Sequence, residues 1–351
     1  MIPRARFVTL LDAEDRRAWD DFVTSHPEAN FLQSWDYYEF HKSRGNKIVR
    51  RIVAEIDPKN DKQTIIAAYA GVVEDAKRGR HLAIAGGPIV DWQKLNLVNL
   101  LVDDIRDQAK KHHCVFARVR PQLERSDEAY VIFKEMGFVP APTYLSVEYA
   151  AILDLHKSEE EILKNMHRRI RYAVNNARNK GFTIEKSQDP KDIHEFYKIQ
   201  LQTARRQNFV SFSEDYLTKQ FAAFAKNNEA VLYTAKYNGE ILAQNFMIFY
   251  GNEASYHYAV STELGTKMSG SPILHVEAMK DARERGIYRY NLWGIVGEDE
   301  KNHRFYGVSF FKRGFGGEEL KYLPAHDLVI NPVAYLKTKA IEKVRKKIRH
   351  I

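Results

Sequence analysis

The feature that most constrains the fold is an order of predicted elements that occurs twice along the chain. In each half, two helices precede an antiparallel meander of strands, and a further helix and strand follow the meander. The repeated order indicates a structural duplication, and because the two halves share no obvious motif, the duplication is an old one. A chain of 351 residues, 44% of them hydrophobic, is too long for one small core. We therefore expect two domains of ordinary size.

In the first half, Trp19, Phe22 and Val23 fall at helical spacing, and a second helical run ends near Gly45. The patterns that follow predict strands at 48–56, 64–73 and 81–85, a helix at 92–112, a strand at 114–119, a helix at 127–136 and a strand at 144–155. This alternation is typical of an α/β domain with a meander near its start.

In the second half, Ser158 and Glu161 form a capping box at the start of a helix that ends before Gly181. A later helix has Ser271 as its N-cap and Pro272 as its first residue. Asn238-Gly239 is the strongest short hairpin signal in the chain. The remaining elements are a helix at 192–206, a meander at 230–237, 240–250 and 254–261, and a strand at 288–293.

This order matches the acetyltransferase-like GNAT fold, used twice. It predicts an α/β (α+β) architecture with an N-terminal GNAT-like domain at 1–155, a C-terminal one at 156–332 and a basic helix at 333–351. A GNAT domain ordinarily holds acyl-CoA on an Arg/Gln-x-x-Gly-x-Gly/Ala turn before a helix. The nearest approach here, 268–271, needs no ligand, so acyl-CoA is a poor cofactor candidate.

The net charge of +8 is concentrated at the C-terminal end. Residues 333–351 hold seven basic residues against Glu342, which leaves 47 basic and 45 acidic residues in the body. Asn331 can cap and Pro332 can start a helix there. Such a basic amphipathic helix suits an anionic membrane surface, while docking onto the protein body and phosphate contacts with tRNA are alternatives. Its apolar stripe is expected at Leu336, Ala340, Val344, Ile348 and Ile351.

The N-terminal residues contain no apolar run long enough for a signal peptide or a membrane span. We therefore expect a cytoplasmic protein, with the inner face of the membrane as a further location. The single cysteine, Cys114, excludes an intrachain disulfide and suits buried strand packing. The histidines show no ligand spacing, so no metal site is expected.

Several segments in the right order resemble the Fem family of peptidoglycan-bridge aminoacyltransferases, also called FemABX. The N-terminal run at 31–42 resembles the family's Gln-Ser-aromatic opening, and 85–91 resembles its Arg-Gly-Pro turn, with Gly86 in place of the usual arginine. The segment 171–177 resembles the helix that opens the second domain, and Thr203 to Phe209 fits a Thr-x-x-Arg-x-x-Phe element. The best match is 306–317 followed by 327–332.

The resemblance covers most of the chain and implies a compact, FemX-like enzyme of two GNAT-like domains, without the helical-hairpin arm of the staphylococcal members. Such enzymes move an amino acid from aminoacyl-tRNA to a stem-peptide amine of a peptidoglycan precursor, which is either lipid II or UDP-MurNAc-pentapeptide. No metal and no diffusible cofactor are implied. The substrate groove is expected at the domain junction.

The resemblance also assigns roles to single residues. Lys312 and Phe311, before a Gly-rich turn, are the catalytic candidates. Lys312 matches the family's catalytic lysine, and a surface strand lysine is the plainer alternative. Lys42 and Arg206 match positions that bind the diphosphate of the precursor, where for Lys42 a solvated charge is the alternative. We expect the small residues of the Gly-rich turn to let the tRNA end approach closely.

Two further residues are candidates for substrate binding. Asp91 could hold the acceptor amine or accept its proton, although a turn-capping aspartate after Gly-Pro is the plainer account. Tyr256 and Tyr258 are expected on one face of a meander strand. We assign Tyr258 to the substrate, and packing accounts for at least one of the pair.

The helix after Ser158 carries two stripes of residues. The apolar stripe is expected at Ile162, Met166, Ile170, Ala173 and Ala177. The basic stripe consists of Lys164, Arg168, Arg171 and Arg178, and either tracks the tRNA acceptor backbone or forms an ordinary solvated face.

Two rival functions belong to other classes. One is an acyl-CoA-dependent GNAT N-acyltransferase, against which the missing pyrophosphate turn counts. The other is a non-catalytic tRNA- or envelope-associated binding protein, for which loss of Lys312 or of the Gly-Phe-Gly-Gly turn would be the sign, and both are present.

Overall fold

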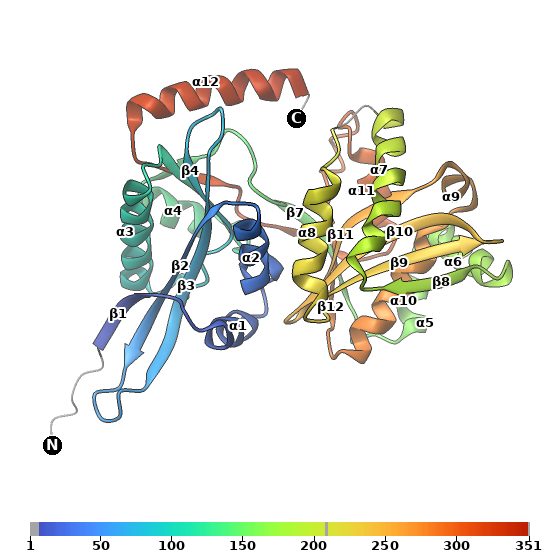
Figure 1. Ribbon diagram of the computed structural model, residues 1–351, viewed down its shortest axis with the longest axis horizontal. Coiled ribbons are helices and arrows are strands. Elements are labelled where there is room, and N and C mark those ends of the chain that lie inside the picture. The colour runs from blue at the N-terminus through green and yellow to red at the C-terminus, as the bar shows by residue number, and fades with distance from the viewer. Residues whose placement is uncertain (1–6, 208–209, 350–351) are drawn as a thin grey trace. The chain divides into compact units, whose positions relative to one another are not determined.

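The structure is a computed structural model that describes the backbone of residues 7–207 and 210–349 and the side chains of 7–205 and 210–344. The chain divides into two compact units. The first unit comprises Met1–Glu148 together with Lys321–Ile351, and the second comprises Tyr149–Leu320. The C-terminal segment therefore returns to the unit in which the chain began (Figure 1).

The first unit is built on a seven-stranded sheet in the order β1-β2-β3-β4-β5-β14-β6. Strands β1 to β4 pair antiparallel, β4 pairs parallel with β5, and β14 lies antiparallel between β5 and β6. The strands are β1 (Phe7–Asp12), β2 (Lys47–Ile56), β3 (Gln63–Glu74), β4 (His81–Gly86), β5 (Phe116–Pro121), β6 (Phe138–Pro140) and β14 (His326–Val329).

Helices cover both faces of this sheet, and Figure 1 shows α2 and α3 on opposite sides of the strands. The apolar face of α3, with Leu101 and Ile105 fully buried, packs on the sheet to form the core of the unit. Cys114 is buried at the edge of this core, in the turn before β5. The helices are α1 (Arg16–Thr24), α2 (Trp35–Ser43), α3 (Leu95–Lys111), α4 (Asp127–Glu135) and α12 (Pro332–Arg349), with a 3₁₀ turn η1 (Phe31–Gln33).

The second unit repeats the plan with a sheet in the order β13-β7-β12-β11-β10-β9-β8. The predicted hairpin at Asn238-Gly239 is confirmed: both residues have positive φ, 50° and 83°, and they join β9 to β10. The strands are β7 (Tyr149–Asp154), β8 (Thr183–Ser187), β9 (Ala230–Tyr237), β10 (Glu240–Tyr250), β11 (Glu253–Ser261), β12 (Arg289–Gly294) and β13 (Glu318–Lys321).

The expected single helix between Ser158 and Gly181 is wrong, because Met166 and His167 adopt extended conformations and divide it into α5 (Glu159–Asn165) and α6 (Arg168–Asn179). The amide of His167 donates outside the helix, to the carbonyl oxygen of Gly314 at 2.8 Å. The predicted apolar stripe is nevertheless confirmed. All five of its residues are buried in the core of this unit: Ile162, Met166, Ile170, Ala173 and Ala177.

The other helices of the second unit lie on the two faces of its sheet. Helix α10 packs in the main core, whereas Phe221 of α8 contacts Phe246 on the opposite face of β10. Helix α10 begins at Ser271 with Gly270 as its N-cap, one residue earlier than predicted. These helices are α7 (Ile193–Gln207), α8 (Glu214–Ala225), α9 (Glu263–Met268), α10 (Ser271–Glu284) and α11 (Tyr306–Arg313), with a 3₁₀ turn η2 (Pro190–Asp192). Within the described residues of both units, every helix is too short or too polar to span a bilayer.

Candidate active site

Lys312 lies in the last turn of α11 and is buried, so the plainer alternative of a surface strand lysine does not hold. Lys312 is only 7% exposed, and its Nζ donates a hydrogen bond to the carbonyl oxygen of Gly294 at 2.8 Å. The same Nζ lies 5.6 Å from the centre of the Tyr256 ring. The ammonium is thus held by a backbone oxygen and an aromatic face.

The strands around Lys312 part from one another at this point. The recorded parallel pairing of β11 and β12 runs from Glu253–Arg289 to Ser255–Asn291, and Tyr256 and Gly294 lie beyond its last pair. Trp293 has a positive φ of 65°, and its amide donates to the Asn291 side chain at 2.7 Å. A tryptophan rarely adopts the left-handed backbone conformation, which needs such a local hydrogen bond to stabilise it. This turn presents the carbonyl of Gly294 to Lys312.

Burial controls the charge of the groups around Lys312. It lowers the pKa of Lys312 to about 7, and no carboxylate among the described residues offsets the effect. His275 of α10 is buried beside it, and burial, with the nearby Lys312 charge, lowers the pKa of this histidine to about 3. The Nδ1 of His275 is 2.9 Å from the Tyr290 hydroxyl. Lys312 therefore faces a neutral imidazole, a neighbour that the sequence pattern does not reveal.

Phe311 and the Gly-rich turn pack inside the second unit. The Phe311 ring contacts His275 and Phe315, with ring centres 5.8 Å and 5.2 Å away. A Cβ on Gly316 would lie 2.5 Å from the carbonyl oxygen of Asn165, and one on Gly317 would lie 2.6 Å from that of Ile152. The expectation that these glycines leave room for a tRNA end is therefore corrected: the protein's own backbone occupies that space.

Tyr256 and Tyr258 lie on opposite faces of the sheet, which contradicts the expectation of a shared face. The register between β10 and β11 shifts between Phe246 and Met247, which pair with Tyr258 and Tyr256 respectively. This bulge adds one residue and breaks the period-two alternation. Tyr256 consequently packs in the main core near His275, whereas Tyr258 contacts Phe212 and Phe246 on the α8 side.

In the first unit, the family-like segments meet around the buried side chain of Gln33. Its amide nitrogen donates to the carbonyl oxygens of Ala85 and Ala70, at 2.7 Å and 3.2 Å, and its amide oxygen accepts from the Ala70 amide at 2.9 Å. A Cβ on Gly87 would lie 2.8 Å from the Gln33 side chain. The resemblance at 31–42 and 85–91 therefore includes residues that fix the start of α2 against β3 and β4.

The two candidate substrate residues of the first unit are exposed. Lys42, in the last turn of α2, is 67% exposed and lies 4.0 Å from Glu39. Asp91 accepts a hydrogen bond from the Gln93 amide at 3.1 Å and pairs with Lys94 at 3.5 Å, as a turn-capping residue does. Their contacts with substrate remain predictions.

The four basic residues assigned to tRNA differ in their surroundings. Lys164 and Arg168 are exposed. Arg171 donates to the carbonyl oxygens of Lys164 and Met166, at 2.6 Å and 2.8 Å, and so caps the end of α5. Arg178 pairs with Glu159 at 2.7 Å. The break between α5 and α6 thus commits two of the four to internal contacts. Arg206 lies near the end of α7, but its side chain is outside the described residues.

The two sheets and their helices define a tandem GNAT-like acyltransferase fold, in agreement with the predicted fold class. A crystal structure of FemX is similar over 94% of this chain and 100% of its own, with a TM-score of 0.84 and 18% identity. A tandem GNAT protein from the clavulanic acid biosynthesis pathway is similar over 93% of this chain and 99% of its own, with a TM-score of 0.52 and 11% identity.

The chain belongs to the FemAB family, whose model matches residues 15–130, 139–240 and 233–343. Among its curated relatives is the lipid II:glycine glycyltransferase of Staphylococcus aureus (strain USA300). The two sequences are 22% identical over an alignment that covers 94% of each chain. The resemblance drawn from the short motifs is thereby confirmed at the level of the family.

Proposed function

We propose that this protein is an aminoacyltransferase that moves an amino acid from aminoacyl-tRNA to a stem-peptide amine of a peptidoglycan precursor. The observation that carries the proposal is the buried Lys312, held on the Gly294 carbonyl where β11 and β12 part, in a member of the FemAB family. The relative that acts on lipid II supports the choice of precursor class.

The reaction needs little beyond positioning and charge stabilisation, because the aminoacyl ester is already activated. The acceptor nitrogen attacks the ester carbonyl carbon, a C–N bond forms, and the carbonyl oxygen becomes an oxyanion. When the intermediate collapses, the C–O bond to the ribose breaks. The released hydroxyl oxygen takes up one proton, matching the proton that the amine loses.

Lys312 is assigned to the oxyanion. A protonated lysine has three N–H donors, and the hydrogen bond to Gly294 uses one of them. The remaining two are available to an oxygen that gains negative charge. Because the side chain is buried and anchored, it needs no reorganisation as the charge develops. Phe311, which packs on His275 beside it, stabilises the helix that carries the lysine.

The remaining candidates are assigned to the two substrates. Lys42 and Arg206 would bind the diphosphate of the precursor, and Asp91 and Tyr258 would contact its peptide. Lys164 and Arg168, which are exposed, suit the phosphates of the tRNA better than Arg171 and Arg178 do, since those two have partners within the chain. The proposal places the enzyme in the cytoplasm, in peripheral contact with the inner face of the membrane if the precursor is lipid II. It assigns no metal and no diffusible cofactor.

The test compares two donors in one assay. The purified protein is incubated with a peptidoglycan precursor and either a mixture of aminoacyl-tRNAs or acetyl-CoA, and the products are identified by mass spectrometry. We expect a mass increase of one amino-acid residue with aminoacyl-tRNA and none with acetyl-CoA. An acetylated product would favour the acyl-CoA-dependent alternative, and binding of tRNA without any product would favour the non-catalytic one. Stem peptides from cells with and without the protein provide the matching measurement in vivo.

A further inference from the structure

Helix α12 docks on the first unit through polar side chains. Tyr335, Thr338 and Glu342 are spaced by three and four residues and are all buried, with exposures of 4%, 1% and 1%. The Tyr335 hydroxyl donates to Asp327 of β14 at 2.6 Å, and the Thr338 hydroxyl donates to the carbonyl oxygen of Arg78. This row is the docked face of the helix.

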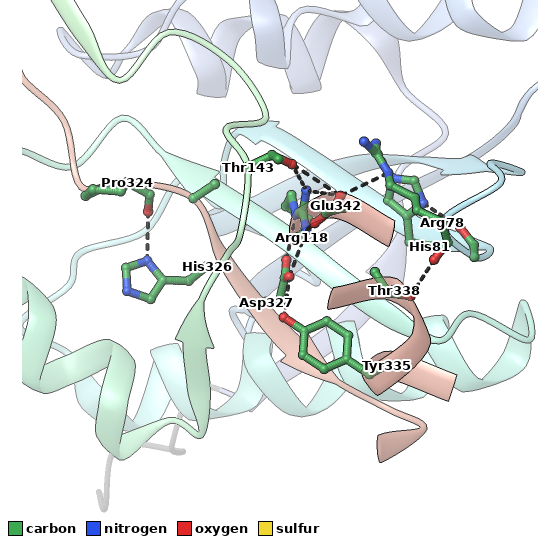
Figure 2. A network of polar contacts seen from close by, with 12 residues as sticks. Arg78, His81, Arg118, Thr143, Pro324, His326, Asp327, Tyr335, Thr338 and Glu342 are labelled. Carbon is green, nitrogen blue, oxygen red and sulfur yellow. Dashed lines mark hydrogen bonds and ion pairs between the residues drawn. The ribbon is translucent and has the colours of Figure 1, made fainter. Parts of the chain in front are cut away.

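The docked face is fixed by a buried ion pair, shown in Figure 2. Arg118 of β5 donates to both carboxylate oxygens of Glu342, at 2.9 Å each, and to both oxygens of Asp327, at 2.7 and 2.8 Å. Thr143 donates to Glu342 at 3.2 Å. A bidentate arginine fork has a narrow range of favourable geometries, so it sets the rotation of α12 about its own axis.

This rotation turns the apolar side of α12 outward. Val333, Leu336 and Val344 are 81%, 68% and 58% exposed, and Ala340 between them is exposed as well. At about 100° per residue, the centre of this row lies about 180° around the helix from the docked face. We call these four residues the apolar stripe. Of the stripe predicted from the sequence, Ile348 and Ile351 lie outside the described side chains.

An amphipathic helix on a globular protein ordinarily does the reverse, burying its apolar side and exposing its carboxylates. Here the one acidic residue of 333–351 is buried, and exposed lysines border the apolar stripe: Lys337 on one side, Lys339 and Lys343 on the other. Glu342 is paired with Arg118, so it does not neutralise these lysines. The outward surface therefore combines aliphatic side chains with positive charge.

We infer that the outward side of α12 binds an anionic lipid surface. The apolar stripe would enter the boundary between headgroups and acyl chains, and Lys337, Lys339 and Lys343 would lie among the phosphates. Charge complementarity selects anionic lipid, and the exposed aliphatic residues select a bilayer over RNA, whose phosphates need only the lysines. The inference rests on the proposed function, because a lipid-linked precursor would bring the enzyme to a membrane. It adds which surface of the protein contacts the lipid.

Co-sedimentation with vesicles tests this without tRNA or precursor, so its outcome is independent of the aminoacyl transfer. The full chain is mixed with vesicles of phosphatidylcholine alone or with phosphatidylglycerol added. We expect binding only to the anionic vesicles. Leu336→Ser/Val344→Ser and, separately, Lys337→Gln/Lys343→Gln should each lower the partition coefficient by roughly tenfold or more.

Each variant has a matched control in the same unit. Leu95→Ser/Val131→Ser removes the same two side-chain types from other exposed positions, and Lys59→Gln/Lys62→Gln removes two exposed lysines from the β2–β3 turn. Both controls should bind as the unchanged protein does. All variants should keep the circular dichroism spectrum and the urea unfolding midpoint of the unchanged protein, which shows that the fold is intact without reference to the aminoacyl transfer.

Three results would overturn the inference. One is vesicle binding that the α12 variants do not alter. Another is a loss of tRNA affinity in Lys337→Gln/Lys343→Gln with unchanged vesicle binding, which would assign the surface to RNA. The third is a dimer that dissociates in Leu336→Ser/Val344→Ser without vesicles, which would make the apolar stripe an interface between two copies of the chain.

Discussion

The Nζ of Lys312 lies 2.8 Å from the carbonyl oxygen of Gly294. A side chain of α11 thus contacts β12 beyond the point where its pairing with β11 ends. Lys312→Met keeps most of the length of the side chain and removes the charge. We expect turnover to fall roughly 100-fold or more with little change in precursor affinity, because an oxyanion donor acts mainly on the transition state. Single-turnover kinetics at saturating aminoacyl-tRNA measure this. Lys191→Met, at an exposed position in η2, is the control, and wild-type turnover in Lys312→Met would refute the role.

The same lysine predicts a pH dependence. Burial lowers its pKa from 10.5 to about 7, so the folded protein loses this proton as pH rises through about 7, whereas the unfolded chain keeps it up to about 10.5. The stability cost of the buried ammonium is therefore full below pH 7 and declines as pH rises toward 10.5.

The catalytic rate should change with pH in the opposite direction from the stability, because only protonated Lys312 can stabilise the oxyanion. The acceptor amine titrates equally in both enzymes, so we expect the ratio of the wild-type rate to the Lys312→Met rate to fall above about pH 7. Stopped-flow or quench measurements over a pH series give this ratio. A ratio that stays constant across the pKa of Lys312 would contradict the assignment.

Arg206→Ala should mostly weaken precursor binding. A charge-assisted hydrogen bond to phosphate is worth about 1.5–3 kcal/mol, so the dissociation constant should rise roughly tenfold to a hundredfold while single-turnover rates at saturation change little. Arg205→Ala, one residue earlier on α7 at an exposed position, is the matched control. Calorimetry or fluorescence titration with the precursor checks both. Equal losses in the two variants would indicate a general charge effect.

The buried ion pair of the first unit predicts a large stability difference between two arginines. Arg118→Met leaves Asp327 buried without its cation and Glu342 with only Arg78, at 3.5 Å, and should lower the free energy of unfolding by about 3–5 kcal/mol. Arg106→Met breaks an ion pair with Asp103 whose carboxylate is exposed and should cost about 0–1 kcal/mol. Urea denaturation of the two variants gives the comparison, and similar losses would argue against a structural role for the Arg118 pairs.

The sequence by itself determined the parts of this protein that depend on local patterns. Turn chemistry predicts the hairpin at Asn238-Gly239, and the period of two residues predicts the strands on either side of it. The period of 3.6 residues predicts the buried apolar residues from Ile162 to Ala177. The order of the motifs along the chain was enough to identify the family.

Local patterns failed where a distant backbone satisfies a group or changes a register. The amide of His167 bonds to the Gly314 carbonyl and ends α5, and the bulge opposite Phe246 and Met247 sends Tyr256 and Tyr258 to opposite faces. Gly314 lies far from His167 in the sequence, and the bulge depends on the pairing of two strands, so period counting along one strand could not detect either effect.

The tertiary structure alone decided the environment of Lys312 and the orientation of α12. The carbonyl of Gly294 and the ring of His275 reach Lys312 only when three separate elements pack together, and it is this burial that lowers its pKa. The sequence predicted a helix at 333–351, but Arg118, more than two hundred residues earlier, sets which side of it faces inward. Burial and ion pairing depend on contacts between distant segments, and an amino-acid pattern specifies those only through the completed fold.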